Sequence, residues 1–182
     1  MQIPWQSLQD FSGATAVGAL TLVGLTLIAN AFAPNLFPAI DIYSRTATWA
    51  IVVALPLLAL CYLLGLLSTG AAEAALIWFR LLDANTLIED TISVSTNGEF
   101  VAGRFQQLRQ EAELLAGSAI ALALLAFGAA LSAWAVEGWR RFLTSVALSA
   151  IVFAVSSVAL SLSRYRSAHR LALAASSQGE DS

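Results

Sequence analysis

The chain has 182 residues, of which 58% are hydrophobic and only 12% are charged, and its mean hydropathy is +0.75. Soluble globular domains contain about 25% charged residues, so this composition does not fit a soluble domain and indicates an integral membrane protein. The formal net charge of −3, with nine arginines and no lysine, also argues against binding to nucleic acid.

Four apolar segments are each long enough to span a bilayer. They cover about residues 11–33, 47–69, 116–136 and 142–163, and none contains Asp, Glu, Lys, Arg or His. About 20 residues at 1.5 Å per residue cross the hydrocarbon layer of roughly 30 Å. We therefore predict an all-α integral membrane protein, a single domain of four transmembrane helices with cytoplasmic helical extensions. Ionisable side chains inside a membrane usually mark ion or substrate sites, so their absence removes most transport chemistry.

The first segment ends in small residues that resemble a signal-peptide cleavage site. Its leader, residues 1–10, has no Lys or Arg, and its apolar run exceeds the usual core of about 7–15 residues. We interpret it as a retained first span. The connection that follows, with Pro34 and Pro38, is expected to form a kinked, partly apolar loop.

The second segment contains Pro56, which is expected to bend the helix because it removes a backbone hydrogen bond. Cys61, the single cysteine, lies mid-span and is expected to be a small buried apolar residue. Helix is predicted to continue beyond the membrane to Asp83. This stretch is apolar on nearly every side, so we expect it to lie in the membrane interface, pack on other cytoplasmic helices or contact another subunit. Glu73 in this stretch is expected to be solvated or paired with an arginine.

Residues 91–102 fit two different structures. Residues 91–96 alternate between polar and apolar, and Asn97-Gly98 is the strongest short signal for a β-hairpin. The same stretch fits a capping box, in which Thr96 and Glu99 begin a helix. We favour the hairpin, which would need support from another subunit or a soluble partner because isolated hairpins are marginally stable.

A seam of apolar residues begins before the third span and continues into it at spacings of four and three: Val101, Phe105, Leu108, Ala112, Leu115, Ala119 and Leu122. This pattern predicts one long helix from about 103 to 136 that projects beyond the bilayer. The last span is expected to extend similarly over 164–175. A surface charge network is expected between the two extensions, joining Arg166, His169 and Arg170 to Glu111 and Glu113.

Small residues recur within the spans at intervals that allow close helix packing: Ala14/Gly18, Ala119/Ala123, Gly128/Ser132 and Ala150/Ala154. The serines Ser145, Ser149 and Ser156 share one face of the last span. We expect this face to pack against a helix, with its hydroxyls bonded to carbonyls of their own helix. The alternative is a subunit interface or a pore wall, and without charged residues such a pore would be weakly selective.

Arginines are distributed unevenly on the two sides of the spans. Six belong to the central section 70–115 and the tail 164–182, namely Arg80, Arg104, Arg109, Arg164, Arg166 and Arg170. Three belong to the other side, namely Arg45, Arg140 and Arg141. The positive-inside rule therefore predicts a multi-pass protein of the inner membrane with both termini in the cytoplasm.

No catalytic motif is present in the sequence, so we expect a protein that is not an enzyme and has no metal or cofactor. We favour a homo-oligomeric membrane scaffold or effector subunit that docks a cytosolic protein and contacts membrane lipid. The candidate docking surface comprises Trp78, Phe79, Phe105, Leu108, Glu111, Arg166 and Arg170. The alternative is a small passive channel. The layout is similar to that of membrane components of bacterial anti-phage defence modules, an architectural analogy that no motif supports.

Overall fold

The computed structural model describes residues 5–33, 47–79, 81–82, 84–95, 99–135 and 137–179. Within these residues the elements are helical: α1 (Trp5–Phe32), α3 (Ala47–Trp78), α4 (Ala84–Ser95), α5 (Glu99–Ala135), the short 3-10 helix η1 (Glu137–Trp139) and α6 (Arg140–Gly179). Four of them, α1, α3, α5 and α6, are long and apolar enough to cross a membrane. The prediction of an all-α protein with four transmembrane helices is confirmed.

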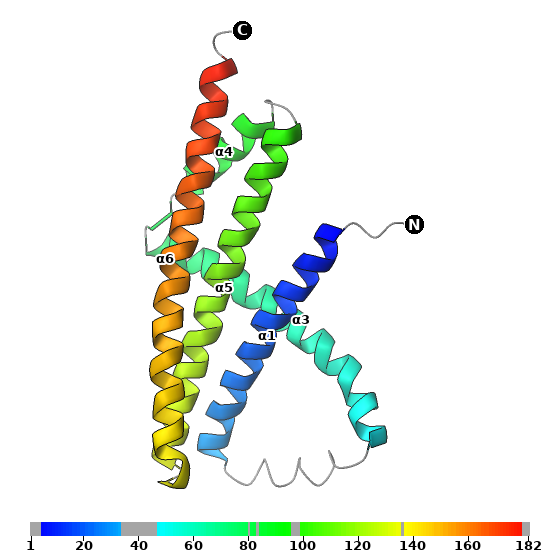
Figure 1. Ribbon diagram of the computed structural model, residues 1–182, viewed down its shortest axis with the longest axis vertical. Helices are drawn as coiled ribbons and strands as arrows, with labels where there is room; N and C mark the ends of the chain where they lie inside the picture. The colour runs from blue at the N-terminus through cyan, green and yellow to red at the C-terminus, as the bar shows by residue number, and fades with distance from the viewer. Residues whose placement is uncertain are drawn as a thin grey trace.

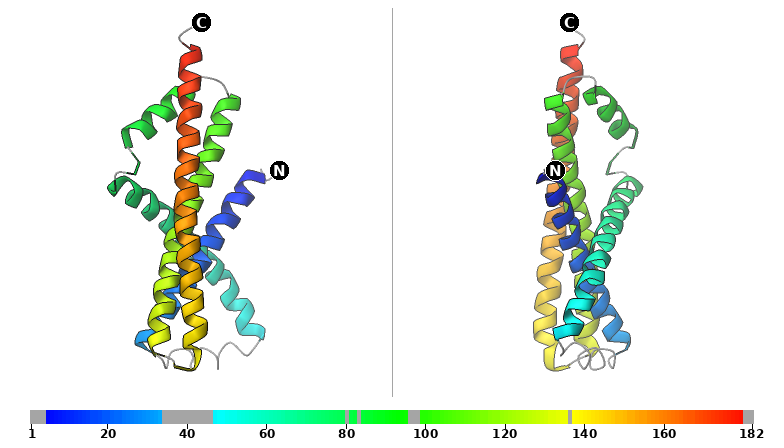
Figure 2. Two further views of the ribbon diagram at one scale, coloured as in Figure 1. Left: turned by 60° about the vertical axis from the view of Figure 1, so that its left-hand side comes forward. Right: turned by 90° about the vertical axis from the view of Figure 1, so that its right-hand side faces the viewer.

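The antiparallel pair α5 and α6 forms the long axis of the molecule and makes its most extensive helix contact. Helix α1 packs against both α5 and α3, and α3 crosses α1 obliquely (Figures 1 and 2). Helix α4 lies beside the parts of α5 and α6 that project past α1. We call this the α4 end of the molecule, and we call the opposite end, where η1 joins α5 to α6, the η1 end.

Helices α1 and α3 cross where two glycines face each other's backbones. A β-carbon on Gly18 would overlap the carbonyl oxygen of Cys61, and one on Gly65 would overlap that of Ala14. Ala14 and Cys61 are buried at the same crossing. The predicted close packing at Ala14/Gly18 and the predicted burial of Cys61 are confirmed.

The contact between α1 and α5 also depends on small residues. A β-carbon on Gly128 would lie 2.6 Å from the carbonyl oxygen of Gly24. One turn further along α5, the Ser132 hydroxyl donates a hydrogen bond to the carbonyl oxygen of Leu27 (3.0 Å). The predicted pair Gly128/Ser132 therefore does pack closely, and its partner helix is α1.

Two further hydroxyl contacts join helices inside the bundle. The Thr21 and Ser68 hydroxyls hydrogen-bond to each other across α1 and α3 (3.0 Å). The buried Ser161 hydroxyl of α6 donates to the carbonyl oxygen of Ala112 in α5 (2.8 Å). Such contacts stabilise helix association in a membrane, where lipid tails are as apolar as the helices and hydrophobic burial gives little drive.

The predicted seam of α5 forms the centre of the α4 end. Ala112 of the seam, together with Ala116, which the predicted seam did not include, packs with Tyr165 of α6 and with Ala72 and Leu76 of α3. Nearer the start of α5, the seam packs against α4 and α6 in a second cluster, made of Val94, Phe105, Leu108, Ala168 and Ala172. The prediction that the third and last spans each belong to one long continuous helix is thus confirmed, and α4 covers the ends of both at the α4 end.

The favoured hairpin at 91–102 is wrong. Residues 91–95 end helix α4 and residues 99–102 begin helix α5, and the described part of the chain contains no strand. Asp90 and Val94 are four residues apart, so in a helix they share one face, and both are buried at the α4 end. This packing outweighs the short alternating pattern in the sequence. The alternative reading, a helix starting near Glu99, fits α5, although the cap at 96–98 lies outside the described residues.

One other predicted boundary shifts. Helix α3 ends at Trp78, before the predicted Asp83, and the backbone then turns, with the Leu81 amide donating to the carbonyl oxygen of Leu76 (2.9 Å). Pro56 lies within the assigned helix α3. The expected loop at 34–45 falls outside the described residues.

Candidate functional site

Arg109 of α5 joins three helices at the α4 end. Its guanidinium group lies 2.8 Å from Oε1 of Glu113 on the same helix and 3.3 Å from Oε1 of Glu73 on α3. It also donates to the Thr91 hydroxyl on α4, at the longer distance of 3.5 Å. Glu73 is therefore paired with an arginine, which is one of the two environments expected for it. All three charged side chains are about one-third exposed, so each pair contributes modestly.

Two more pairs attach α6 to its neighbours. Arg164 lies 3.3 Å from Oε2 of Glu111 on α5. His169 Nδ1 lies 2.8 Å from Oδ2 of Asp90 on α4, whose carboxylate is largely buried. Ion pairs and hydrogen bonds thus fix α3, α4, α5 and α6 relative to one another at this end.

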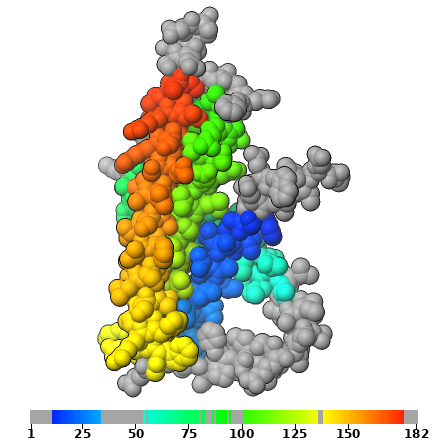
Figure 3. Space-filling view, in the orientation of Figure 1, coloured from blue at the N-terminus to red at the C-terminus, as the bar shows by residue number. Residues whose placement is uncertain are grey.

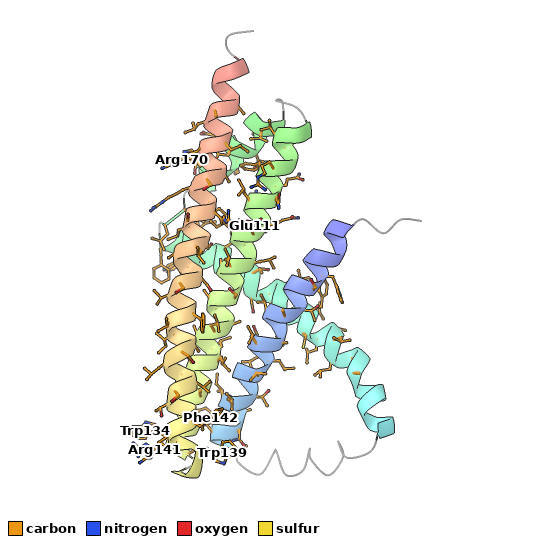
Figure 4. The ribbon with its side chains drawn as sticks, in the orientation of Figure 1. Glu111, Trp134, Trp139, Arg141, Phe142 and Arg170 are labelled. Carbon is orange, nitrogen blue, oxygen red and sulfur yellow. The ribbon has the colours of Figure 1, made fainter. Side chains whose placement is uncertain are left out.

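The expected charge network exists, but its predicted pairs are wrong. Glu111 pairs with Arg164 and Glu113 with Arg109, while His169 turns to α4. The reason is geometric: α4, of which only residues 91–95 belonged to the predicted hairpin, lies against the face of α6 that carries His169. Arg166 and Arg170 remain exposed on α6, and Figure 4 shows Arg170 and Glu111 in the half of the molecule toward the α4 end.

Tyr165 lies in the core of this end and was not among the predicted site residues. Only 4% of its surface is exposed, and its hydroxyl has no hydrogen-bond partner among the described residues. Its ring packs with Ala72 and Leu76 of α3 and with Ala112 of α5. The ring therefore contributes to packing between α3, α5 and α6.

The predicted docking surface is only partly on the surface. Phe105 and Leu108 are 4% and 6% exposed because α4 and α6 cover them, so their assignment to an interaction surface is wrong. Trp78 is 83% exposed and Phe79 is also exposed, as a docking role requires. Both residues belong to the apolar seam of the sequence, and this membership was already a signal that they are buried in a core.

Exposed apolar side chains continue from the end of α3 onto α4. They comprise Trp78, Phe79, Leu81, Ile88 and Ile92, which we call the 78–92 surface. Ile88 and Ile92 are one turn apart on α4, and Ile88 is 59% exposed. Sequence reasoning missed these two isoleucines because it treated part of α4 as a strand, although their spacing of four residues is a helical signal.

The serine face of α6 is exposed along its length. The hydroxyls of Ser145, Ser149 and Ser156 donate to carbonyl oxygens one turn earlier in the same helix, at 2.9–3.0 Å, as predicted. No described helix covers them, so the predicted packing of this face does not occur within one chain. In Figure 3, α6 (yellow to red) runs along one side of the molecule.

Aromatic side chains gather at the η1 end. Trp134, Trp139 and Phe142 are exposed there, close to Arg141, as Figure 4 shows. The rings of Trp139 and Phe142 meet edge to face, with centroids 5.9 Å apart. Trp and Tyr rings concentrate where membrane helices meet the polar headgroups, and this cluster lies where α5 ends and α6 begins.

Fold and site together define a multi-pass membrane protein of four helices, with a helical end held by ion pairs. The described residues contain no group of three side chains arranged to hold a metal ion. Comparison with known proteins found no family model, no curated protein and no solved structure that matches the chain.

Proposed function

We propose that this protein is a scaffold subunit of the inner membrane that assembles with copies of itself and docks a cytosolic protein at its α4 end. The observation that carries the proposal is the exposure of Ile88 and Ile92 on a helix that follows the end of the second span. Apolar side chains grouped on a surface beyond the membrane are typical of interaction sites.

The distribution of arginines supports a cytoplasmic α4 end. Five described arginines belong to it, namely Arg104, Arg109, Arg164, Arg166 and Arg170, and two belong to the η1 end, namely Arg140 and Arg141. Positively charged residues near the ends of spans favour the cytoplasmic side. Both termini would then be cytoplasmic.

The 78–92 surface suits a docking role because α4 is held in place before any partner arrives. Val94 is packed against Phe105 and Ala168, and Asp90 is bound to His169. A rigid surface loses little conformational entropy on binding, which favours affinity. A partner with an apolar helix or groove would fit the two isoleucines Ile88 and Ile92, which lie one turn apart.

Self-association is proposed for the membrane part of α6. Its large apolar side chains, including Leu148 and Ile151, are exposed between the serines, and only 11% of its most apolar stretch of 18 residues is buried in one chain. The serine hydroxyls are bonded to their own helix, so a second helix can approach this face without leaving polar groups unpaired.

Site-specific photocrosslinking in cells tests docking. A crosslinker at position 88 is expected to yield a discrete adduct with one soluble protein, and Ile92→Asp is expected to abolish it. A crosslinker at position 173 is the matched control, because Leu173 is similarly exposed (55%) at the α4 end but lies on α6. The same adduct from position 173, or no adduct from position 88, would contradict the docking proposal.

Self-association is tested by the mass of the protein in detergent and by flux through liposomes. We expect an oligomer that Ser149→Leu dissociates, without conduction in either form. A stable monomer would refute the scaffold. Ion flux that Ser149→Leu abolishes, with the oligomer intact, would instead establish the serine face as a pore wall.

A further inference from the structure

A groove with a volume of about 360 Å³ opens between α3, α5 and α6, in the half of the spans nearer the α4 end. Its wall is made largely of small apolar side chains, among them Ala75, Ala119, Ala123 and Ala154. Ser161 also lines it, but its hydroxyl is donated to the carbonyl oxygen of Ala112. The groove is therefore apolar throughout, and its volume falls in the range of about 300–1,000 Å³ typical of ligand sites.

A smaller pocket of about 150 Å³ adjoins the groove on the side of the α4 end, and Leu81 lines both. Its lining combines leucines with polar side chains, among them Asp90, His169 and Arg166. Asp90 and His169 are bound to each other at 2.8 Å. Asp90 is thus engaged by His169, whereas Arg166 has no ion-pair partner among the described residues, so the Arg166 guanidinium is the group in this pocket that an anionic ligand can pair with.

We propose that the groove and the pocket together bind one anionic glycerophospholipid, with an acyl chain in the groove and the phosphate at Arg166. The charged side chain lies beyond one end of the apolar groove, just as the phosphate of such a lipid lies beyond one end of its acyl chain. Arg166 follows Ser161 by five residues, or about 8 Å along the helix, which places the guanidinium just beyond the apolar groove. Arginine pairs with phosphate through two parallel hydrogen bonds, and basic pockets between membrane helices are known sites for anionic headgroups.

Charge distinguishes this ligand from the other molecules that could fill the groove. A helix from a second copy would supply apolar side chains but no anion for Arg166. A zwitterionic lipid carries the phosphate together with its own compensating cation. An anionic lipid offers both an acyl chain for the groove and a phosphate without its own cation for Arg166, in either orientation of the protein.

The test uses the full-length protein, purified in detergent, stripped of lipid and titrated with dioleoyl-phosphatidylglycerol or dioleoyl-phosphatidylcholine. Native mass spectrometry counts the bound lipids. Arg166→Gln is expected to weaken phosphatidylglycerol binding about fivefold, the factor that one Arg near an anionic lipid is worth, and to leave phosphatidylcholine binding unchanged. Arg104→Gln removes the same charge from an exposed site on α5 away from the pocket, and is expected to change neither.

A second variant tests the groove itself. Ala123→Leu fills it and is expected to reduce binding of both lipids, whereas Ala130→Leu, at an exposed position of α5 that does not line the groove, is expected to have no effect. Circular dichroism of each variant checks that it is folded. Equal binding of the two lipids by the unmodified protein, or equal effects of Arg166→Gln and Arg104→Gln, would overturn the proposal. So would an Ala123→Leu variant that lowers oligomer mass but retains lipid, because a second copy would then occupy the groove.

Discussion

Replacing Gly18 by alanine is expected to separate α1 from α3. The new β-carbon would overlap the carbonyl oxygen of Cys61 and lie 2.8 Å from the backbone nitrogen of Gly65, inside the 3.0 Å limit that real β-carbons respect. Both obstacles are backbone atoms, which cannot rotate away, so the two helices must move apart along their contact. Overpacking of this kind costs about 1–3 kcal/mol, and rigid backbone on the opposing side favours the upper value.

A matched substitution is available in α3. Gly70 is also helical, but a β-carbon there would have no neighbour within 4 Å. Alanine has a helix propensity higher than that of glycine by about 0.8–1.0 kcal/mol, and this gain applies to both substitutions. We therefore expect Gly70→Ala to stabilise the protein by up to about 1 kcal/mol and Gly18→Ala to destabilise it by about 2 kcal/mol.

The measurement is reversible unfolding in mixed micelles of mild detergent and dodecyl sulfate, followed by tryptophan fluorescence and circular dichroism. The two variants should differ by about 3 kcal/mol in free energy of unfolding, because the propensity gain cancels and only the clash remains. Equal midpoints for Gly18→Ala and Gly70→Ala would refute the assignment of Gly18 to a close backbone crossing.

Three further predictions follow from polar groups at the α4 end and on α6. Ser161→Ala should lower the free energy of unfolding by about 1 kcal/mol, since it removes a buried bond between helices, whereas Ser149→Ala should change it little. Tyr165→Phe should leave stability unchanged or raise it by up to about 1 kcal/mol, because the hydroxyl it removes is buried without a described partner; a larger loss would reveal a bond. Arg164→Gln should cost less than about 1 kcal/mol in the same unfolding assay, because Arg164 and Glu111 are both exposed; a cost above 2 would contradict this.

The spans were predictable because four charge-free apolar segments of sufficient length leave no other fold. The extension of α5 was predictable too, since its seam keeps one period from Val101 to Leu122. Helix α4 was not, because a segment of 12 residues carries both a helical and an alternating pattern, and contacts with α5 and α6 decide between them. Local pattern thus suffices for long helices and fails for the short one.

The site was less predictable than the fold. The pair Arg109 and Glu113 is four residues apart on one helix, and its spacing is visible in the sequence. The contacts of Arg109 with Glu73 and of His169 with Asp90 depend on how separate helices are placed, which spacing within a helix does not specify. The predicted small-residue pairs likewise identified helix faces that pack closely. They did not identify the glycines of the neighbouring helix that these faces contact, such as Gly65 opposite Ala14 and Gly24 opposite Gly128.

Helix α6 is one uninterrupted element of 40 residues, and it contacts α5 along its length but α4 only near its carboxyl end. At 1.5 Å per residue it is a rod of about 60 Å, longer than the bilayer is thick. The residue that holds α4, His169, and the exposed serines of the membrane part therefore belong to one continuous helix, with no loop or break between them.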